Sequence, residues 1–231
     1  SFLGFFRDKG KEPPACVYWH QQTTRPISLK SLMQTADAVG KLSYEALAKS
    51  VDANRGGENN AFYKILGSCA TFIDDRTGKD LGGVDAFPYN RIFAMDSLTE
   101  TSNAAMKMQI GARPMASPGD YGVAQNNLMN FLRLCTQGIV CPFVMTAHVD
   151  RETDGVTQMT KIMIKAIGKA LATEIPTLFS EMIYTTREAD RFYWDTAAYG
   201  VDTKTRSLGI KSKIEPDFAL IFDKWKVRAG L

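Results

Sequence analysis

Two short apolar runs constrain the fold of this 231-residue chain more than any other feature. Ile92-Phe-Ala-Met95 ends at Asp96, and the run 139–145 ends in Thr146-Ala-His148. Continuous apolar runs of this length, bounded by polar residues, are typical of strands covered on both faces of a sheet. Helical patterns separate the two runs, so we expect parallel strands whose functional residues follow the strand ends.

The other expected elements give a mixed α/β order. Helices are expected at 1–8, 27–51, 61–71, 99–110 and 123–136. Strands are expected at 15–19, 92–95, 139–145 and near 161–167, 182–186, 191–196 and 218–222. Loops are expected at 111–122 and 150–158, and residues 74–85 predict an exposed loop or β-ribbon insertion. The chain is therefore expected to be one α/β domain, 1–231, with a mainly parallel central sheet flanked by helices and an antiparallel, strand-rich C-terminal extension.

Composition limits the class of protein. The chain is 45% hydrophobic and 23% charged, which is ordinary for a globular protein with one sizeable core. A formal net charge of +3 is too small to indicate nucleic-acid binding without a clustered patch. The four cysteines form no CxxC pair and there are two histidines, so no zinc site is expected and a reducing, intracellular setting fits best. No apolar run is long enough to span a bilayer.

Asp96, at the end of the first apolar run, has two interpretations. An aspartate after a strand often caps the next helix, and Thr99 with Glu100 could serve in the same cap. The functional interpretation places the carboxylate at a ligand site beyond the strand end. The order of the elements favours the functional interpretation, because a second buried run ends in Thr146-Ala-His148 after two intervening helices.

This order and its motifs resemble the core of RecA-like ATPases. Met95-Asp-Ser-Leu-Thr99 resembles their Walker B strand, and Phe143-Val-Met-Thr-Ala-His148 is similar to the strand that carries their sensor residue. The closest resemblance is to the phage-encoded, AAA-type ATP-binding proteins of the RecA-like recombinase group. Their later strand, threonine and basic element are similar to Tyr193-Trp-Asp-Thr196 and Lys204-Thr-Arg206. The resemblance covers most of residues 15–222 and implies a RecA-like fold.

The resemblance implies roles for individual residues at an ATP and Mg²⁺ site. Asp96 would hold Mg²⁺ through its water shell, with Ser97 as an auxiliary polar contact, and His148 would contact the γ-phosphate or its attacking water. Lys204 and Arg206 would enter a neighbouring subunit's site and stabilise the transition state of phosphoryl transfer. The alternatives are a capping or core histidine for His148 and a solvated β-hairpin for Lys204 and Arg206.

The loops 111–122 and 150–158 occupy the positions of the family's two DNA-binding loops. The resemblance makes Arg113, Tyr121 and Lys161 candidate contacts to single-stranded DNA. Charge alone does not predict this binding, because the second loop is net acidic.

The sequence departs from the family pattern in two places. No GxxxxGK[ST] phosphate-binding loop occurs in it, so that loop is expected just upstream of Ser1, whose hydroxyl is then a candidate nucleotide contact. His20-Gln21-Gln22 stands where the family commonly carries an acidic residue that activates water, and glutamine is a poor base.

The resulting prediction is a phage-type, RecA-like ATP-binding protein that acts on single-stranded DNA in recombination or replication. ATP and Mg²⁺ are the expected cofactors, a homo-oligomeric ring or filament is the expected assembly, and other phage proteins are candidate partners. The expected location is the cytoplasm of an infected bacterial host, with no membrane association. The first alternative is a catalytically inactive, P-loop-derived structural or interaction subunit, for example of a virion assembly. The second alternative is an NTPase that remodels protein partners without DNA.

Overall fold

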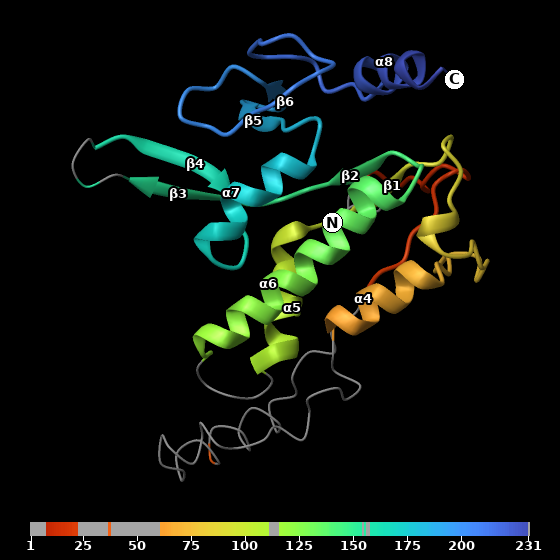
Figure 1. Ribbon diagram of the computed structural model, residues 1–231. Coiled ribbons are helices and arrows are strands. Elements are labelled where there is room, and N and C mark those ends of the chain that lie inside the picture. The colour runs from red at the N-terminus through yellow and green to blue at the C-terminus, as the bar shows by residue number, and fades with distance from the viewer. Residues whose placement is uncertain are drawn as a thin grey trace. The chain divides into compact units, whose positions relative to one another are not determined.

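The computed structural model describes residues 8–22, 37, 61–110, 116–153, 155 and 158–230 (Figure 1). The chain divides into two compact units. The first comprises Ser1–Phe93, Lys107–Ala116 and Gly138–Pro142, and the second comprises Ala94–Met106, Ser117–Gln137 and Phe143–Leu231. The predicted helix at 27–51 lies outside the described residues except for Asp37, and the predicted helix at 1–8 does so except for Asp8.

The described residues form a mixed α/β structure (Figure 1). Its α-helices are α4 (Ala61–Ala70), α5 (Leu98–Ile110), α6 (Pro118–Arg133), α7 (Lys169–Leu178) and α8 (Ala219–Ala229). Its strands are β1 (Phe93–Met95), β2 (Phe143–Met145), β3 (Val149–Thr153), β4 (Thr160–Ile164), β5 (Tyr184–Glu188) and β6 (Arg191–Asp195). A short 3₁₀ helix (Val84–Ala86) and a π-helical turn (Leu134–Gly138) complete the regular elements of these ranges.

The two apolar runs form the parallel pair β1 and β2, as predicted. The N–H of Phe93 donates to the carbonyl of Pro142 at 2.9 Å, and the N–H of Thr146 donates to the carbonyl of Met95 at 3.1 Å. Both strands are shorter than predicted, because Ile92 lies outside β1 and residues 139–142 lie outside β2. The described strands pair two by two, one pair parallel and two antiparallel, rather than in one mainly parallel sheet.

The antiparallel C-terminal extension contains two hairpin-like pairs. β3 pairs with β4 from Val149 opposite Ile164 to Thr153 opposite Thr160, and β5 pairs with β6 from Tyr184 opposite Asp195. The predicted strands near 161–167, 182–186 and 191–196 are confirmed by β4, β5 and β6. The prediction of a loop throughout 150–158 is wrong, because β3 extends to residue 153. Its polar residues form a strand because the ladder with β4 depends on backbone groups, and all five β3 side chains remain exposed.

The prediction of a strand at 218–222 is wrong, because these residues begin helix α8. The carboxylate of Asp217 accepts the N–H of Ala219 at 2.8 Å, and Gly230 ends the helix in a left-handed conformation at φ 71°. Aromatic packing at the helix start adds to these local signals, since Trp194 meets Phe218 edge to face at 5.0 Å between ring centroids. Helix α7 was also not predicted, and Pro176 lies inside it.

Helix α6 begins earlier than predicted, at Pro118 rather than residue 123. Ser117 and Asp120 form a capping box, and proline at the first helical position is compatible with a helix start. The prediction of a loop over 111–122 is therefore wrong for its last five residues, while 111–115 lie outside the described residues. Helices α6 and α7 pack together, and Arg133 pairs with Glu174 at 3.0 Å on the exposed side.

The second unit has its apolar core on these helices. Leu128 and Leu132 of α6 are fully buried, and the described core also includes Leu98, Ala104, Ala105, Ala124, Met129, Phe131, Cys135, Leu171, Ala172, Ile175 and Trp194. Burial of these side chains supplies the main favourable term for folding this unit. All four cysteines are free thiols.

In the first unit, the segment predicted as a strand at 15–19 is a turn followed by an irregular segment, and that prediction is wrong. The carbonyls of Ala15 and Val17 accept hydrogen bonds from a side chain rather than from a neighbouring strand, while that of Trp19 accepts the N–H of Asp75 at 2.9 Å. The guanidinium of Arg76 donates to the carbonyls of Pro13, at 3.1 Å, and Val17, at 2.9 Å, and lies 4.9 Å from the centre of the Trp19 ring. A side chain that satisfies these backbone acceptors replaces the ladder that a strand would need.

The predicted ribbon at 74–85 is present as a narrow turn rather than a pair of strands. Ile73 and Asp80 form an antiparallel bridge, and the N–H of Leu81 donates to the carbonyl of Phe72 at 2.8 Å. Much of the turn is exposed, but Asp74 is completely buried. The carboxylate of Asp74 accepts hydrogen bonds from the N–H of Trp19, at 3.1 Å, and from the N–H of Thr77, at 3.0 Å. This residue therefore joins the turn to the irregular segment that contains Trp19.

Candidate functional site

Asp96 and Thr146 follow the two parallel strands and meet at their carboxyl ends. The hydroxyl of Thr146 donates to Oδ1 of Asp96 at 2.5 Å, and both side chains are exposed. The backbone of Thr146 is held on the same side, because its carbonyl accepts the N–H of Leu98 at 2.8 Å. The peptide bond between Asp96 and Ser97 is cis. The strand pair thus fixes an exposed carboxylate with one oxygen engaged.

Ser97, rather than Asp96, caps helix α5. The hydroxyl of Ser97 accepts the N–H of Glu100 at 3.4 Å, and its carbonyl accepts the N–H of Thr101 at 3.0 Å. Ser97 is buried, with 6% of its surface exposed. The capping interpretation of Asp96 is therefore wrong, since the Asp96 carboxylate makes its hydrogen bond to the neighbouring strand instead.

The backbone of His148 is fixed by a buried threonine. The N–H of His148 donates to Oγ1 of Thr99 at 3.2 Å, and Oγ1 donates to the carbonyl of Lys165 at 3.1 Å. The carbonyl of His148 in turn accepts the N–H of Lys165 at 2.8 Å. The imidazole itself is exposed, so the interpretation of His148 as a core histidine is wrong.

The chemistry of Asp96 fits a magnesium ion held through water. Mg²⁺ keeps several waters and often uses only one or two protein carboxylates, and Oδ2 of Asp96 accepts no hydrogen bond from the described residues. Across the described ranges, no group of three histidine, cysteine, aspartate or glutamate side chains could hold a metal. Asp96 is therefore the one carboxylate at these strand ends that could hold a metal through water, in the part of the chain that the structure describes.

Lys204 and Arg206 lie on a segment that is held from several sides. Lys204 forms an antiparallel bridge with Met182, and its ammonium lies 3.5 Å from the carbonyl of Pro176. Oε1 of Glu181 accepts the N–H groups of Arg206, at 3.1 Å, and of Ser207, at 2.9 Å.

Two basic side chains of helix α8 also bind the backbone of this segment. Arg228 donates to the carbonyl of Arg206 at 2.6 Å, and Lys224 donates to the carbonyl of Ser207. The Arg206 side chain remains exposed. Among the described residues, no hydrogen bond or ion pair joins Lys204 or Arg206 to Asp96 or His148.

The remaining candidate contacts are not brought together. Tyr121 lies on α6 with 41% of its surface exposed, and Lys161 on β4 forms an ion pair with Asp202 at 3.1 Å. Ser1 and Arg113 lie outside the described residues.

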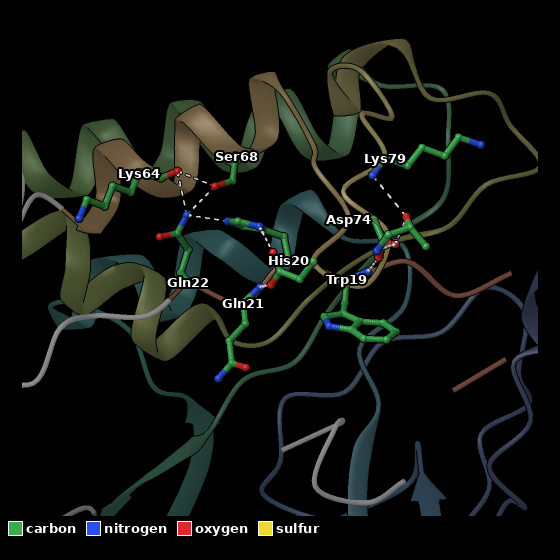
Figure 2. A network of polar contacts seen from close by, with 10 residues as sticks. Trp19, His20, Gln21, Gln22, Lys64, Ser68, Asp74 and Lys79 are labelled. Atoms are coloured by element: carbon green, nitrogen blue, oxygen red, sulfur yellow. Dashed lines mark hydrogen bonds and ion pairs between the residues drawn. The ribbon is translucent and has the colours of Figure 1, made fainter. Parts of the chain in front are cut away.

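A second polar network surrounds His20, Gln21 and Gln22 in the first unit (Figure 2). Nδ1 of His20 lies 2.9 Å from Oδ1 of Asp75, whose Oδ2 accepts the N–H of Gln21 at 2.7 Å. The amide nitrogen of Gln22 donates to the carbonyl of Lys64 at 3.1 Å and to the hydroxyl of Ser68 at 2.5 Å. The Gln22 side chain is therefore hydrogen-bonded to helix α4, whereas the Gln21 side chain is exposed.

Sequence reasoning missed two residues of these sites. The sequence predicts only a possible helix cap for Thr99, which joins His148 to Lys165, and only a loop or β-ribbon position for Asp75, which binds His20. For Thr99, the signal was its position just after the first strand end, because the second strand end, which carries His148, was expected to lie close by. For Asp75, no local signal exists, because its partners are 54 and 55 residues away in sequence.

The described structure belongs to the mixed α/β class, with one parallel strand pair whose ends carry Asp96, Thr146 and His148. Comparisons with family models, with curated proteins and with solved structures found no match for the chain. No helix within the described ranges is long and apolar enough to cross a membrane.

Proposed function

We propose that this chain is a RecA-like ATP-binding protein that uses Mg²⁺ and acts on single-stranded DNA in phage recombination or replication. Asp96 holds the water shell of the metal, and His148 contacts the terminal phosphate. The proposal includes a homo-oligomer in which Lys204 and Arg206 reach a neighbouring subunit.

The observation that carries the proposal is the hydrogen bond between Thr146 and Asp96 at 2.5 Å. It links the ends of two parallel strands, which is where open α/β sheets bind their ligands. It also leaves one carboxylate oxygen free to accept a hydrogen bond from a metal-bound water. Mg²⁺ in phosphoryl-transfer sites is commonly bound by one or two protein carboxylates, several waters and the phosphates of the substrate. The exposed imidazole of His148, two residues after Thr146, is available to an anionic ligand.

The test is nucleotide binding with and without metal. A fluorescent ATP analogue should bind more tightly in Mg²⁺ than in EDTA, and Asp96→Asn should remove that difference while leaving metal-free binding unchanged. Asp150→Asn, at another exposed aspartate, is the matched control and should behave as the wild type. If the wild type does not bind the analogue at millimolar concentration, the proposal is wrong.

A second candidate function is a nucleotide-binding or structural subunit that does not hydrolyse ATP. The observation that favours it is the Gln22 side chain, whose amide nitrogen is committed to Lys64 and Ser68 (Figure 2). Neither Gln21 nor Gln22 can act as a general base toward water. Under this alternative, the analogue binds but phosphate release stays at the uncatalysed rate with or without single-stranded DNA. DNA-stimulated phosphate release would contradict it.

A further inference from the structure

An open hollow of about 490 Å³ lies beside β4, and none of the candidate residues at Asp96 or His148 lines it. Glu152 of β3 and residues 159–161, at the start of β4, form one side, and residues 199–202 form the other. All of these residues belong to the second unit. Sites for small organic ligands commonly have volumes of about 300–1,000 Å³, so the hollow is large enough for one.

The hollow is built by a close approach of two backbone segments. Residues 200–202 run parallel to β4, since the N–H of Ile162 donates to the carbonyl of Gly200 at 2.7 Å and its carbonyl accepts the N–H of Asp202 at 3.2 Å. Gly200 has φ +70°, and a Cβ added there would lie 2.8 Å from the carbonyl oxygen of Thr160. Only glycine tolerates both the backbone conformation and this contact. The wall that carries Tyr199 is therefore set at a fixed place beside β4.

Tyr199 is the unusual member of this wall. The side chain has 86% of its surface exposed although it borders the hollow. The described residues offer no hydrogen-bond partner to its hydroxyl and no ring that packs on its face. An exposed aromatic face at the edge of a hollow suits a planar ring that can stack on it. Met159 borders the same space, and its thioether is a favourable neighbour for an aromatic ring.

The charges around the hollow are balanced. Lys161 pairs with Asp202 at 3.1 Å, and Lys169 pairs with Glu152. Each carboxylate is thus neutralised by one lysine, which leaves no excess positive charge for a free phosphate. A neutral heteroaromatic ring avoids the cost of bringing a charge into this space. The polar groups at the rim can still form hydrogen bonds with the edge of such a ring.

We infer that this hollow takes an unpaired nucleobase, which stacks on Tyr199 while the paired side chains at the rim contact the edge of the base. This inference rests on the proposed action on single-stranded DNA. A base of a single strand and a base of a free nucleotide share the same chemistry, and the two arms of the experiment distinguish them.

The first arm compares labelled single strands by fluorescence anisotropy. The wild type should bind a thymidine oligonucleotide about tenfold more tightly than an abasic strand with the same number of phosphates, since stacking contributes per base. Tyr199→Phe keeps the ring and should bind as the wild type, whereas Tyr199→Leu should lose about tenfold. The salt dependence of binding should be the same in all three proteins, because it reports phosphate contacts rather than stacking.

Phe192→Leu is the control for loss of an exposed aromatic ring. Phe192 lies on β6 with 56% of its surface exposed and does not border the hollow. Its substitution should change affinity less than twofold. Equal losses from Tyr199→Leu and Phe192→Leu, or equal binding of the abasic strand, would overturn the inference and leave the proposed function standing.

The second arm measures NMR spectra of ¹³C-tyrosine-labelled protein with two free nucleotides, thymidine monophosphate and deoxyadenosine monophosphate. The ring signal of Tyr199, assigned by its absence in Tyr199→Phe, should shift at millimolar nucleotide. A shift in a protein that binds no oligonucleotide would support the base site and contradict the single-strand function. Absence of both the shift and oligonucleotide binding would overturn the inference and the single-strand function together.

Discussion

The hydroxyl of Thr146 lies 2.5 Å from Oδ1 of Asp96, across the ends of the parallel strands β1 and β2. A hydroxyl donor to one oxygen of a carboxylate orients the other oxygen, as partners of metal-holding residues do in known sites. The pair is therefore a structural contact, and under the proposed function Oδ2 of Asp96 is the oxygen that would accept a metal-bound water.

Removal of this donor is expected to weaken metal-dependent nucleotide binding. Thr146→Val keeps the shape of the side chain but leaves Asp96 without its partner, so affinity for the ATP analogue in Mg²⁺ should fall about tenfold. Affinity in EDTA should stay unchanged. Thr146→Ser restores the hydroxyl and should restore binding, and a Thr146→Ser protein as weak as Thr146→Val would show that the methyl group matters instead.

Thr99 is expected to contribute to stability more than its size suggests. Thr99→Val would leave the N–H of His148 and the carbonyl of Lys165 without their shared hydroxyl. A typical hydrogen bond contributes about 0.5–1.5 kcal/mol, and both of these are partly buried, so urea denaturation should show a decrease in the unfolding free energy of that order. Thr99→Ser should retain most of the stability. Equal unfolding free energies for Thr99→Val and wild type would contradict the role assigned to the hydroxyl.

Asp74 is expected to make the first unit sensitive to acid. Burial by itself raises the pKa of Asp74, but hydrogen bonds from the Thr77 hydroxyl and from the backbone N–H groups of Trp19, Thr77 and Arg76 outweigh it, and the pKa is lowered from 3.8. Because the folded-state pKa is lower than the unfolded-state value, the stabilisation is complete above about pH 4 and is lost as the pH falls through the folded-state pKa.

The measurement is the free energy of unfolding between pH 7 and pH 3. Asp74→Asn should be less stable than wild type at pH 7, and the difference should shrink toward pH 3. Asp190→Asn, at an exposed turn position, should track the wild type throughout. A constant difference between Asp74→Asn and wild type would show that ionisation of Asp74 does not contribute.

The cysteines are expected to react with iodoacetamide in a defined order. Burial raises the pKa of the Cys69 thiol to about 11, so at pH 8 only about one molecule in a thousand carries the reactive thiolate at that position. Cys16 is exposed and should be alkylated first, with Cys69 and the buried Cys135 and Cys141 protected until the protein unfolds. Mass spectrometry of timed digests measures this order, and early modification of Cys69 would contradict its burial.

The secondary structure could be predicted where a local pattern agreed with its surroundings. The apolar runs before Asp96 and Thr146 predicted β1 and β2, and helix α5 was expected within one residue of its start. The strand expected at 218–222 failed because an apolar run of that length fits a helix equally well, and aromatic packing with Trp194 together with the caps favours α8. The strand expected at 15–19 does not form, because the carbonyls of Ala15 and Val17 accept hydrogen bonds from Arg76, which lies 59 residues beyond Val17.

The sequence by itself determined which residues could carry chemistry, because a carboxylate or an imidazole after a buried run is visible in the order of amino acids. Only the tertiary structure decided what each of them contacts. It bound Asp96 to Thr146 across 50 residues and placed Tyr199 beside β4. The physical reason is that a helix cap or a strand depends on neighbours in sequence, whereas these contacts depend on distant segments brought together by the core.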